Sequence, residues 1–132
     1  MADTAHGVLH ARPHPAPMGT SFMELDLPLE LSRLHEETTW STGQNARTLI
    51  KYDTLRVVLV ALKAGKSLSE HRTEGRISIQ VLAGHVEVKS VGRTFNLHAG
   101  GLLALDRNLA HDVRALQESA VLLTVAWPGE EK

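Results

Sequence analysis

The stretch from Gly65 to Gly84, GKSLSEHRTEGRISIQVLAG, contains the pattern on which the fold assignment rests. Its glycines stand at intervals of about ten residues, and the segment Ile77–Leu82 is rich in β-branched and aliphatic side chains. The same spacing continues at Gly92 and at the pair Gly100–Gly101. Turn signals at such intervals between short apolar runs are typical of an all-β sandwich or barrel.

Similar runs occupy the rest of the chain after Gly43. We predict strands at Arg47–Lys51, Leu55–Leu62, Ile77–Leu82, Val86–Lys89, Arg93–Leu97, Leu102–Leu105, Asp112–Leu116 and Ala120–Trp127. The runs 55–62 and 120–127 are apolar on both faces, which is typical of central or covered strands. No helical run interrupts the series, so the fold class is predicted to be all-β.

A different pattern precedes this region. Histidines and prolines dominate the first residues, which predicts an extended arm over residues 1–24. Pro28, Glu30 and leucines at helical spacing predict a short helix near residues 28–37, with the acidic residues at its end on a solvated face. We therefore divide the chain into the arm, a helix with a lead-in strand (25–54) and a barrel (55–128).

Composition narrows the function classes. The chain has 132 residues, 42% of them hydrophobic and 22% charged, as expected for one globular domain. Its net charge of -1 and scattered basic residues argue against a nucleic-acid partner. We expect no membrane partner and a cytoplasmic protein, because no apolar run approaches the roughly 20 residues of a membrane span and no secretory signal is visible. Since cysteine is absent, any metal must use nitrogen and oxygen ligands.

Two stretches resemble the paired motifs of the cupin superfamily. The first motif has a glycine, a histidine after five further residues, and a closing glycine, and Gly65, His71 and Gly84 hold these positions. The second has glycine, proline, glycine and histidine, and its positions are held by Gly100, Asp106, Asn108 and His111. The resemblance spans residues 55–127. It implies a double-stranded β-helix, in which two facing sheets form a jelly-roll barrel around a cavity.

The sequence departs from the family at two ligand positions. Cupins with a full site resemble each other in using three histidines and a glutamate around one divalent metal. Of these four, His71 and His111 are present, whereas Thr73 and Ile77 replace the second histidine and the glutamate. We assign no cofactor with certainty, and the resemblance leaves open a divalent metal, namely Zn, Fe, Mn or Ni. With two protein ligands where at least three are usual, we expect His71 and His111 to hold it weakly at most.

A third ligand would have to come from elsewhere in the chain. Candidates are Glu70, Glu74, Gln80 and the arm histidines His6, His10 and His14. Because side chains alternate across a strand, an inward-facing Ile77 places Ile79 and Val81 inward and Gln80 on the opposite face. This parity disfavours Gln80, and nothing in the sequence fixes the geometry of the arm histidines.

The predicted ligand pocket consists of His71, Thr73, Ile77, Ile79 and His111. An apolar wall with two imidazoles suits a small molecule, which the histidines can hydrogen-bond or exchange a proton with. The first function class is thus a small-molecule-binding cupin protein with at most a weakly held metal. The alternative is a metal-dependent cupin enzyme of the dioxygenase, isomerase or lyase type with a reduced two-histidine site. A third interpretation makes both histidines ordinary core residues. No catalytic residue is assigned.

Two expectations concern the remaining apolar surface. We predict a homodimer, because Leu55–Leu62 is apolar on both faces and the helix is too short to cover a whole sheet. Cupins commonly pair in this way, by resemblance. We assign no role to Trp40, Tyr52 and Trp127, because isolated aromatic residues are more often packing residues.

Overall fold

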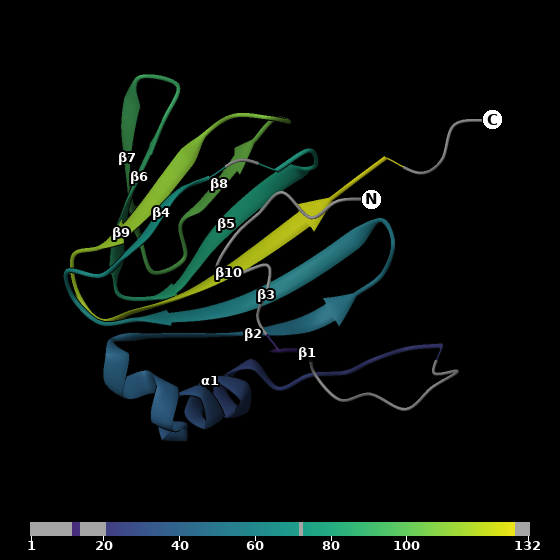
Figure 1. Ribbon diagram of the computed structural model, residues 1–132, viewed down its shortest axis with the longest axis vertical. Coiled ribbons are helices and arrows are strands. Elements are labelled where there is room, and N and C mark those ends of the chain that lie inside the picture. The colour runs from purple at the N-terminus through teal and green to yellow at the C-terminus, as the bar shows by residue number, and fades with distance from the viewer. Residues whose placement is uncertain (1–11, 14–20, 72, 129–132) are drawn as a thin grey trace.

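The computed structural model describes residues 12–13, 21–71 and 73–128, with the backbone alone at 12–13 and 69–71. The helices are α1 (Leu27–Glu36) and the 3-10 helix η2 (Thr38–Thr42). The strands are β1 (Arg12–Pro13), β2 (Gln44–Lys51), β3 (Leu55–Leu62), β4 (Ser67–His71), β5 (Arg76–Ala83), β6 (His85–Ser90), β7 (Arg93–His98), β8 (Leu102–Leu105), β9 (His111–Ala115) and β10 (Ser119–Ala126). Figure 1 shows the two sheets they form, with α1 on the outside.

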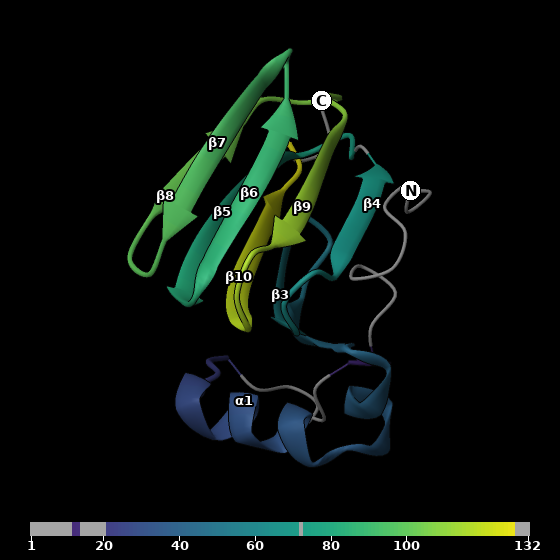
Figure 2. The same cartoon turned by 90° about the vertical axis from the view of Figure 1, so that its left-hand side faces the viewer.

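The two sheets face each other as the layers of a jelly roll. The larger sheet has the order β1-β2-β3-β10-β5-β8 and the smaller one the order β4-β9-β6-β7. Figure 2 shows the smaller sheet in front of the larger one. The chain crosses between the sheets repeatedly, so that neighbouring strands such as β3 and β10 are distant in the sequence. This arrangement confirms the all-β, double-stranded β-helix prediction.

The main core fills the space between the sheets. On β5 the side chains of Ile77, Ile79 and Val81 are at most 3% exposed, whereas Ser78 and Gln80 on the other face are half-buried. Valines and leucines of β3, β6, β9 and β10 complete the same apolar cluster. The strand parity predicted from the sequence is therefore confirmed for this strand.

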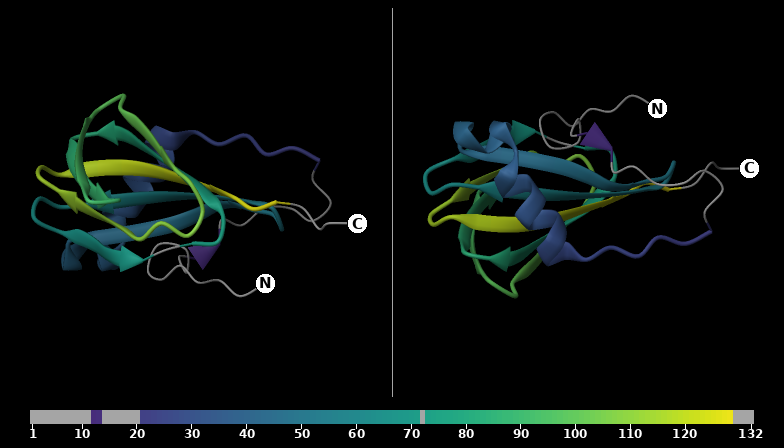
Figure 3. Two further views of the ribbon diagram at one scale, coloured as in Figure 1. Left: turned by 90° about the horizontal axis from the view of Figure 1, so that it is seen from above. Right: turned by 90° about the horizontal axis from the view of Figure 1, so that it is seen from below.

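A second, smaller core lies between α1 and the outer face of the larger sheet. Figure 3 shows α1 lying across this sheet when the molecule is seen from below. Leu34 of α1 packs with Leu49, Leu59 and Ala61 in this cluster, and each of the four is at most 2% exposed. In β2 the register with β3 shifts between Thr48 and Ile50, which is a β-bulge at Leu49.

Local chemistry explains why the helix begins and ends where it does. The Asp26 carboxylate accepts a hydrogen bond from the Leu29 backbone N–H at 3.1 Å, which caps the first turn. Pro28 lies in that turn, where its missing N–H costs nothing. Gly43 follows η2 with a φ of 99°, a left-handed conformation that glycine adopts without strain. The predicted helix is confirmed, shifted by one residue.

The prediction of a solvated face at the end of the helix is wrong for Glu37. Its carboxylate accepts a hydrogen bond from the Asn45 side chain at 2.9 Å and pairs with the Arg47 guanidinium. Asn45 also donates to the Leu34 carbonyl oxygen at 3.0 Å, and Glu30, 3% exposed, lies 3.7 Å from Arg47. The start of β2 therefore carries polar partners for the helix, and these contacts fix α1 against the sheet.

The eight predicted strands are all present, with ends shifted by up to three residues. Sequence reasoning missed β1 and β4. The segment SLSEH of β4 is short and mostly polar, so it lacks the apolar run that identified the others. Within the described part of the chain, no helix is both long enough and apolar enough to cross a membrane.

Two glycines allow the effect of backbone strain to be separated from the effect of close packing. Gly84 and Gly92 have φ values of 89° and 72°, so alanine is strained at both. A Cβ at Gly84 would overlap the backbone of Glu118 and Ser119, whereas at Gly92 it would meet nothing within 4 Å. We expect Gly92→Ala to lower the free energy of unfolding by about 1–2 kcal/mol. Gly84→Ala should lower it by about 2–5 kcal/mol, the same strain with overpacking added. Urea unfolding measures both, and equal losses would contradict the close packing at Gly84.

Candidate functional site

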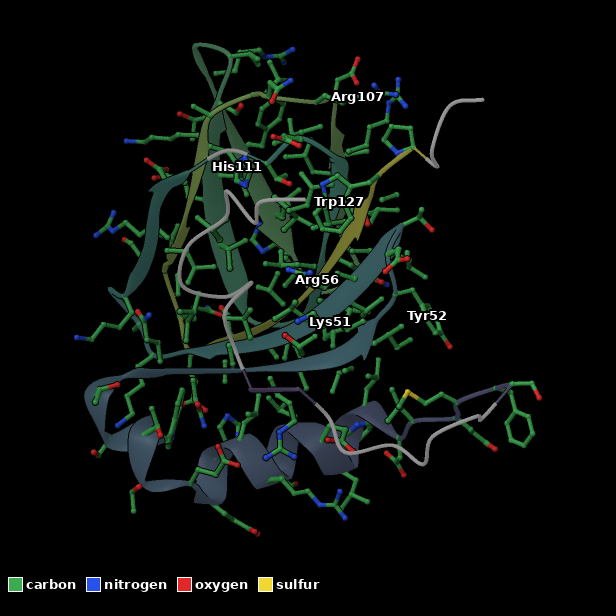
Figure 4. The ribbon with its side chains drawn as sticks, turned by 45° about the vertical axis from the view of Figure 1, so that its right-hand side comes forward. Lys51, Tyr52, Arg56, Arg107, His111 and Trp127 are labelled. Carbon is green, nitrogen blue, oxygen red and sulfur yellow. The ribbon has the colours of Figure 1, made fainter. Side chains whose placement is uncertain are left out.

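His111 is the first residue of β9 and is 2% exposed. Its side chain lies on the same face of β9 as those of Val113 and Ala115, which belong to the core between the sheets. Figure 4 shows its ring in that space. Its Nδ1 lies 3.0 Å from the Leu109 carbonyl oxygen. Since a carbonyl oxygen can only accept, we assign the proton to Nδ1, and the neutral ring then presents Nε2 as an acceptor. Metal-binding histidines show the same arrangement of ring nitrogens.

His71 ends β4 directly opposite His111. The two residues are partners in the β4–β9 ladder, after a register shift that follows Leu68. Partners across an antiparallel ladder occupy the same face of a sheet. The side chain of His71 lies outside the described part of the structure, so its approach to His111 stays a prediction.

Thr73 connects the loop after β4 with the loop between β8 and β9. It is 3% exposed, and its hydroxyl oxygen accepts a hydrogen bond from the Gly75 N–H at 3.3 Å. Its carbonyl oxygen accepts another from the Asn108 N–H at 2.9 Å. Asn108 has a φ of 61°, so the residue that replaces the family's glycine keeps the left-handed conformation, which asparagine tolerates better than most residues.

Asp106, at the family's proline position, does not supply a proton donor at neutral pH. The Arg107 backbone N–H donates to its carboxylate at 2.8 Å, and the Arg76 Nε lies 3.0 Å from it. The backbone hydrogen bond first, and the Arg76 charge second, lower the pKa of Asp106 below its ordinary value. Its side chain therefore stays a carboxylate, exposed to solvent.

The candidate third metal ligands remain separate in the described part of the chain. There, no group of three or more histidine, aspartate or glutamate side chains converges on one point. Glu74 is exposed, and Gln80 lies on the outer face of β5, as its parity predicted. The side chain of Glu70 and the arm histidines His6, His10 and His14 lie outside the described residues.

One row of side chains crosses the larger sheet at the end where His111 lies. Successive partners in this row are Lys51, Arg56, Val125, Ile77 and Leu105. Arg56 is 7% exposed, in phase with the core valines of β3. Its Cζ lies 5.2 Å from the ring centroid of Trp127, which is itself 8% exposed. A buried arginine thus shares a row with Ile77.

Sequence reasoning missed Arg56 and assigned no role to Trp127. The signal was present, because Arg56 alternates in phase with Val58 and Val60 in a strand predicted to be covered on both faces. A charged residue at an inward position of such a strand is unusual enough to mark a candidate site. Trp127 follows Val125 by two residues and packs into the same core.

Two pockets lie near this end of the barrel. One, of about 740 Å³, is lined by Lys51, Tyr52, Asp53, Thr54, Arg56, Trp127 and Pro128. The other, of about 690 Å³, is lined by residues 89–94 of the β6–β7 hairpin and by Asn108, Leu109, Ala110 and Asp112. Neither is lined by Ile77 or Ile79, whose side chains pack into the core. Figure 4 shows Lys51, Arg56 and Trp127 along one side of the barrel and Tyr52 projecting outward.

Comparisons with known proteins bear on the fold. A scan against protein-family models finds no match, and a search of the curated proteins finds none either. Solved structures do match. A cupin superfamily protein from Desulfitobacterium hafniense is 16% identical over 64% of this chain and 78% of its own, with a TM-score of 0.63. KdgF from Halomonas is 23% identical over 66% of this chain and 82% of its own, with a TM-score of 0.59.

A larger neighbour shows the same barrel. Salicylate 1,2-dioxygenase from Pseudoaminobacter salicylatoxidans, crystallised with gentisate, is 17% identical over 77% of this chain, with a TM-score of 0.70. This chain spans 32% of that enzyme. Identities this low support a common fold and leave the activity open. The chain therefore has the double-stranded β-helix fold of the cupin superfamily proteins.

Proposed function

We propose that this protein binds a small molecule at the barrel end that carries His71 and His111, with at most a weakly held divalent metal. The observation that carries the proposal is the buried imidazole of His111. The Leu109 carbonyl oxygen orients the ring, and we propose that Nε2 accepts a hydrogen bond from a ligand group. Ile77 and Ile79 are apolar, like most residues of small-molecule sites, and because they are packed in the core a ligand would have to displace neighbouring side chains to reach them.

The two replaced ligand positions support a weak metal site. Ile77 packs between Leu105 and Val125 in the sheet and offers no donor atom where the family resemblance implies a glutamate. The Thr73 hydroxyl is already engaged by the Gly75 N–H. Protein zinc sites ordinarily use three or four protein ligands, so a site limited to two histidines binds weakly.

The second candidate function is a metal-dependent enzyme of the dioxygenase, isomerase or lyase type that uses His71 and His111. Its support is the likeness of the barrel to that of the salicylate dioxygenase. That likeness concerns the fold, and unrelated functions share this fold. Whether the native protein retains a metal ion after treatment with a chelator distinguishes the two candidate functions.

Ligand binding at His111 is testable by NMR with a library of small organic fragments. We expect bound fragments to shift the ring signals of His111 and the methyl signals of Ile77 and Ile79. His111→Phe keeps the buried volume but removes the acceptor, so affinity should fall at least tenfold, the effect of about 1.4 kcal/mol. His98→Phe, on the exposed end of β7, is the matched control and should change nothing. Equal affinity in His111→Phe and the native protein would contradict the proposal.

Metal affinity is the second test. Mn, Fe, Ni and Zn are titrated into chelator-treated native protein and into the Thr73→His, Ile77→Glu variant. Since loss of even an outer partner costs ten- to a hundredfold in affinity, we expect the variant to bind at least about a hundredfold more tightly. Thr73→His with Ser78→Glu, whose carboxylate lies on the outer face of β5, is the matched control. If the native protein keeps one equivalent of metal through chelation, the enzyme is the better interpretation.

We also propose that the protein is a homodimer. Leu102 on β8 is 64% exposed and supports this proposal. The outer face of β2 and β3 does not, because α1 covers it and Leu59 and Ala61 of β3 are 0% exposed. Light scattering at micromolar concentration should give twice the 14.4 kDa of one chain. Leu102→Lys should shift the mass towards one chain, whereas Leu29→Lys, 47% exposed on α1, should leave it unchanged. A single-chain mass for the native protein would rule the dimer out.

A further inference from the structure

We propose that the pocket between the β2–β3 hairpin and the end of β10 binds the carboxylate of a small organic acid. Lys51 and Arg56 supply the positive charge, and Trp127 supplies an aromatic wall. This inference deepens the proposed function, on which it rests for the position of the rest of the ligand. The pocket itself is defined by its own lining residues.

The hairpin brings two cations to one face of the sheet. Lys51 and Arg56 are direct partners in the β2–β3 ladder, and both line the pocket. Directly opposite residues have Cβ atoms about 5 Å apart and their side chains on the same face. Both positive groups can therefore reach one bound anion. The lining residue with the opposite charge is Asp53, which is exposed at the turn of the hairpin.

Arg56 suits a carboxylate better than a simple cation would. Its guanidinium carries five N–H donors in a planar fork that matches the two oxygens of a carboxylate. Its Cζ lies over the Trp127 ring, 5.2 Å from the centroid, and this contact limits the rotation of the group. An oriented guanidinium can donate two parallel hydrogen bonds to one carboxylate while its other donors serve further partners.

The surroundings favour an organic acid over an inorganic anion. The pocket volume of about 740 Å³ is within the roughly 300–1,000 Å³ of small-molecule sites. From Arg56 the same row of the sheet continues through Val125 to Ile77, two strand spacings or roughly 10 Å away. Within the pocket, Trp127 and Pro128 offer an apolar surface to the hydrocarbon part of an acid held at Arg56.

The test uses three probes: benzoate, its neutral isostere benzamide, and inorganic phosphate. Binding is followed by NMR through the indole N–H of Trp127 and the side-chain N–H of Arg56. We expect benzoate to shift both signals and to bind at least tenfold more tightly than benzamide or phosphate. Lys51→Gln and Arg56→Lys should each lower the affinity for benzoate at least fivefold. Lys89→Gln removes an exposed cation from the opposite sheet and should have no effect.

The variants remain informative if Arg56→Lys fails to fold, because Lys51 is exposed and Lys51→Gln disturbs no core contact. Equal binding of benzamide, equal binding of phosphate, or no shift of Trp127 with benzoate would each overturn the inference. If benzoate shifts the NMR signals of His111 and Ile77 but not those of Trp127, the proposed function stands and this inference is wrong. If benzoate binds at Trp127 and Lys51, His111→Phe does not weaken it and no fragment binds at His111, this inference stands and the proposed function is wrong.

Discussion

The register of β10 determines which side chains meet between the two sheets. This strand lies in the middle of the larger sheet and pairs with both β3 and β5 along its length. Val125 is aligned with Arg56 on one side and with Ile77 on the other. A slip of one residue would turn every inward side chain of β10 outward, so the hydrophobic pattern of the strand specifies the register strongly. The row that contains the candidate site therefore depends on the last strand of the chain.

The interior at this end combines an apolar wall with buried polar groups at defined positions. Ile77 is in the core where the family resemblance implies a carboxylate, and Arg56 is buried two strands away. A buried carboxylate needs a positively charged partner, whereas a buried cation needs a negatively charged one. The electrostatics of this barrel thus differ from those expected of a full metal site. They are in keeping with the carboxylate site proposed at Arg56.

Glycine spacing was enough to predict an all-β sandwich or barrel, strand parity the inward positions of β5, and the cupin resemblance the double-stranded β-helix. Glycine spacing and strand parity depend only on residues that are near each other in the sequence. They failed for the polar strand β4, and for Glu37, whose partners Asn45 and Arg47 are contributed by the next strand. For the site, His111, Thr73 and Ile77 were placed by motif resemblance. The proximity of Arg56 to Trp127 depends on the β3–β10 pairing, which no local pattern specifies.

The bulge at Leu49 has a consequence for the charge of the pocket. Before it, Thr48 is aligned with Val58, and after it Lys51 is aligned with Arg56, so one extra residue lies in β2. Leu49 and Ile50 consequently both contact the cluster under α1. If β2 alternated strictly through Leu49 with no bulge, Lys51 would lie on the helix side of the sheet. The bulged conformation at Leu49 therefore keeps Lys51 on the same face as Arg56, so that two positive charges rather than one lie on that face at this end of the barrel.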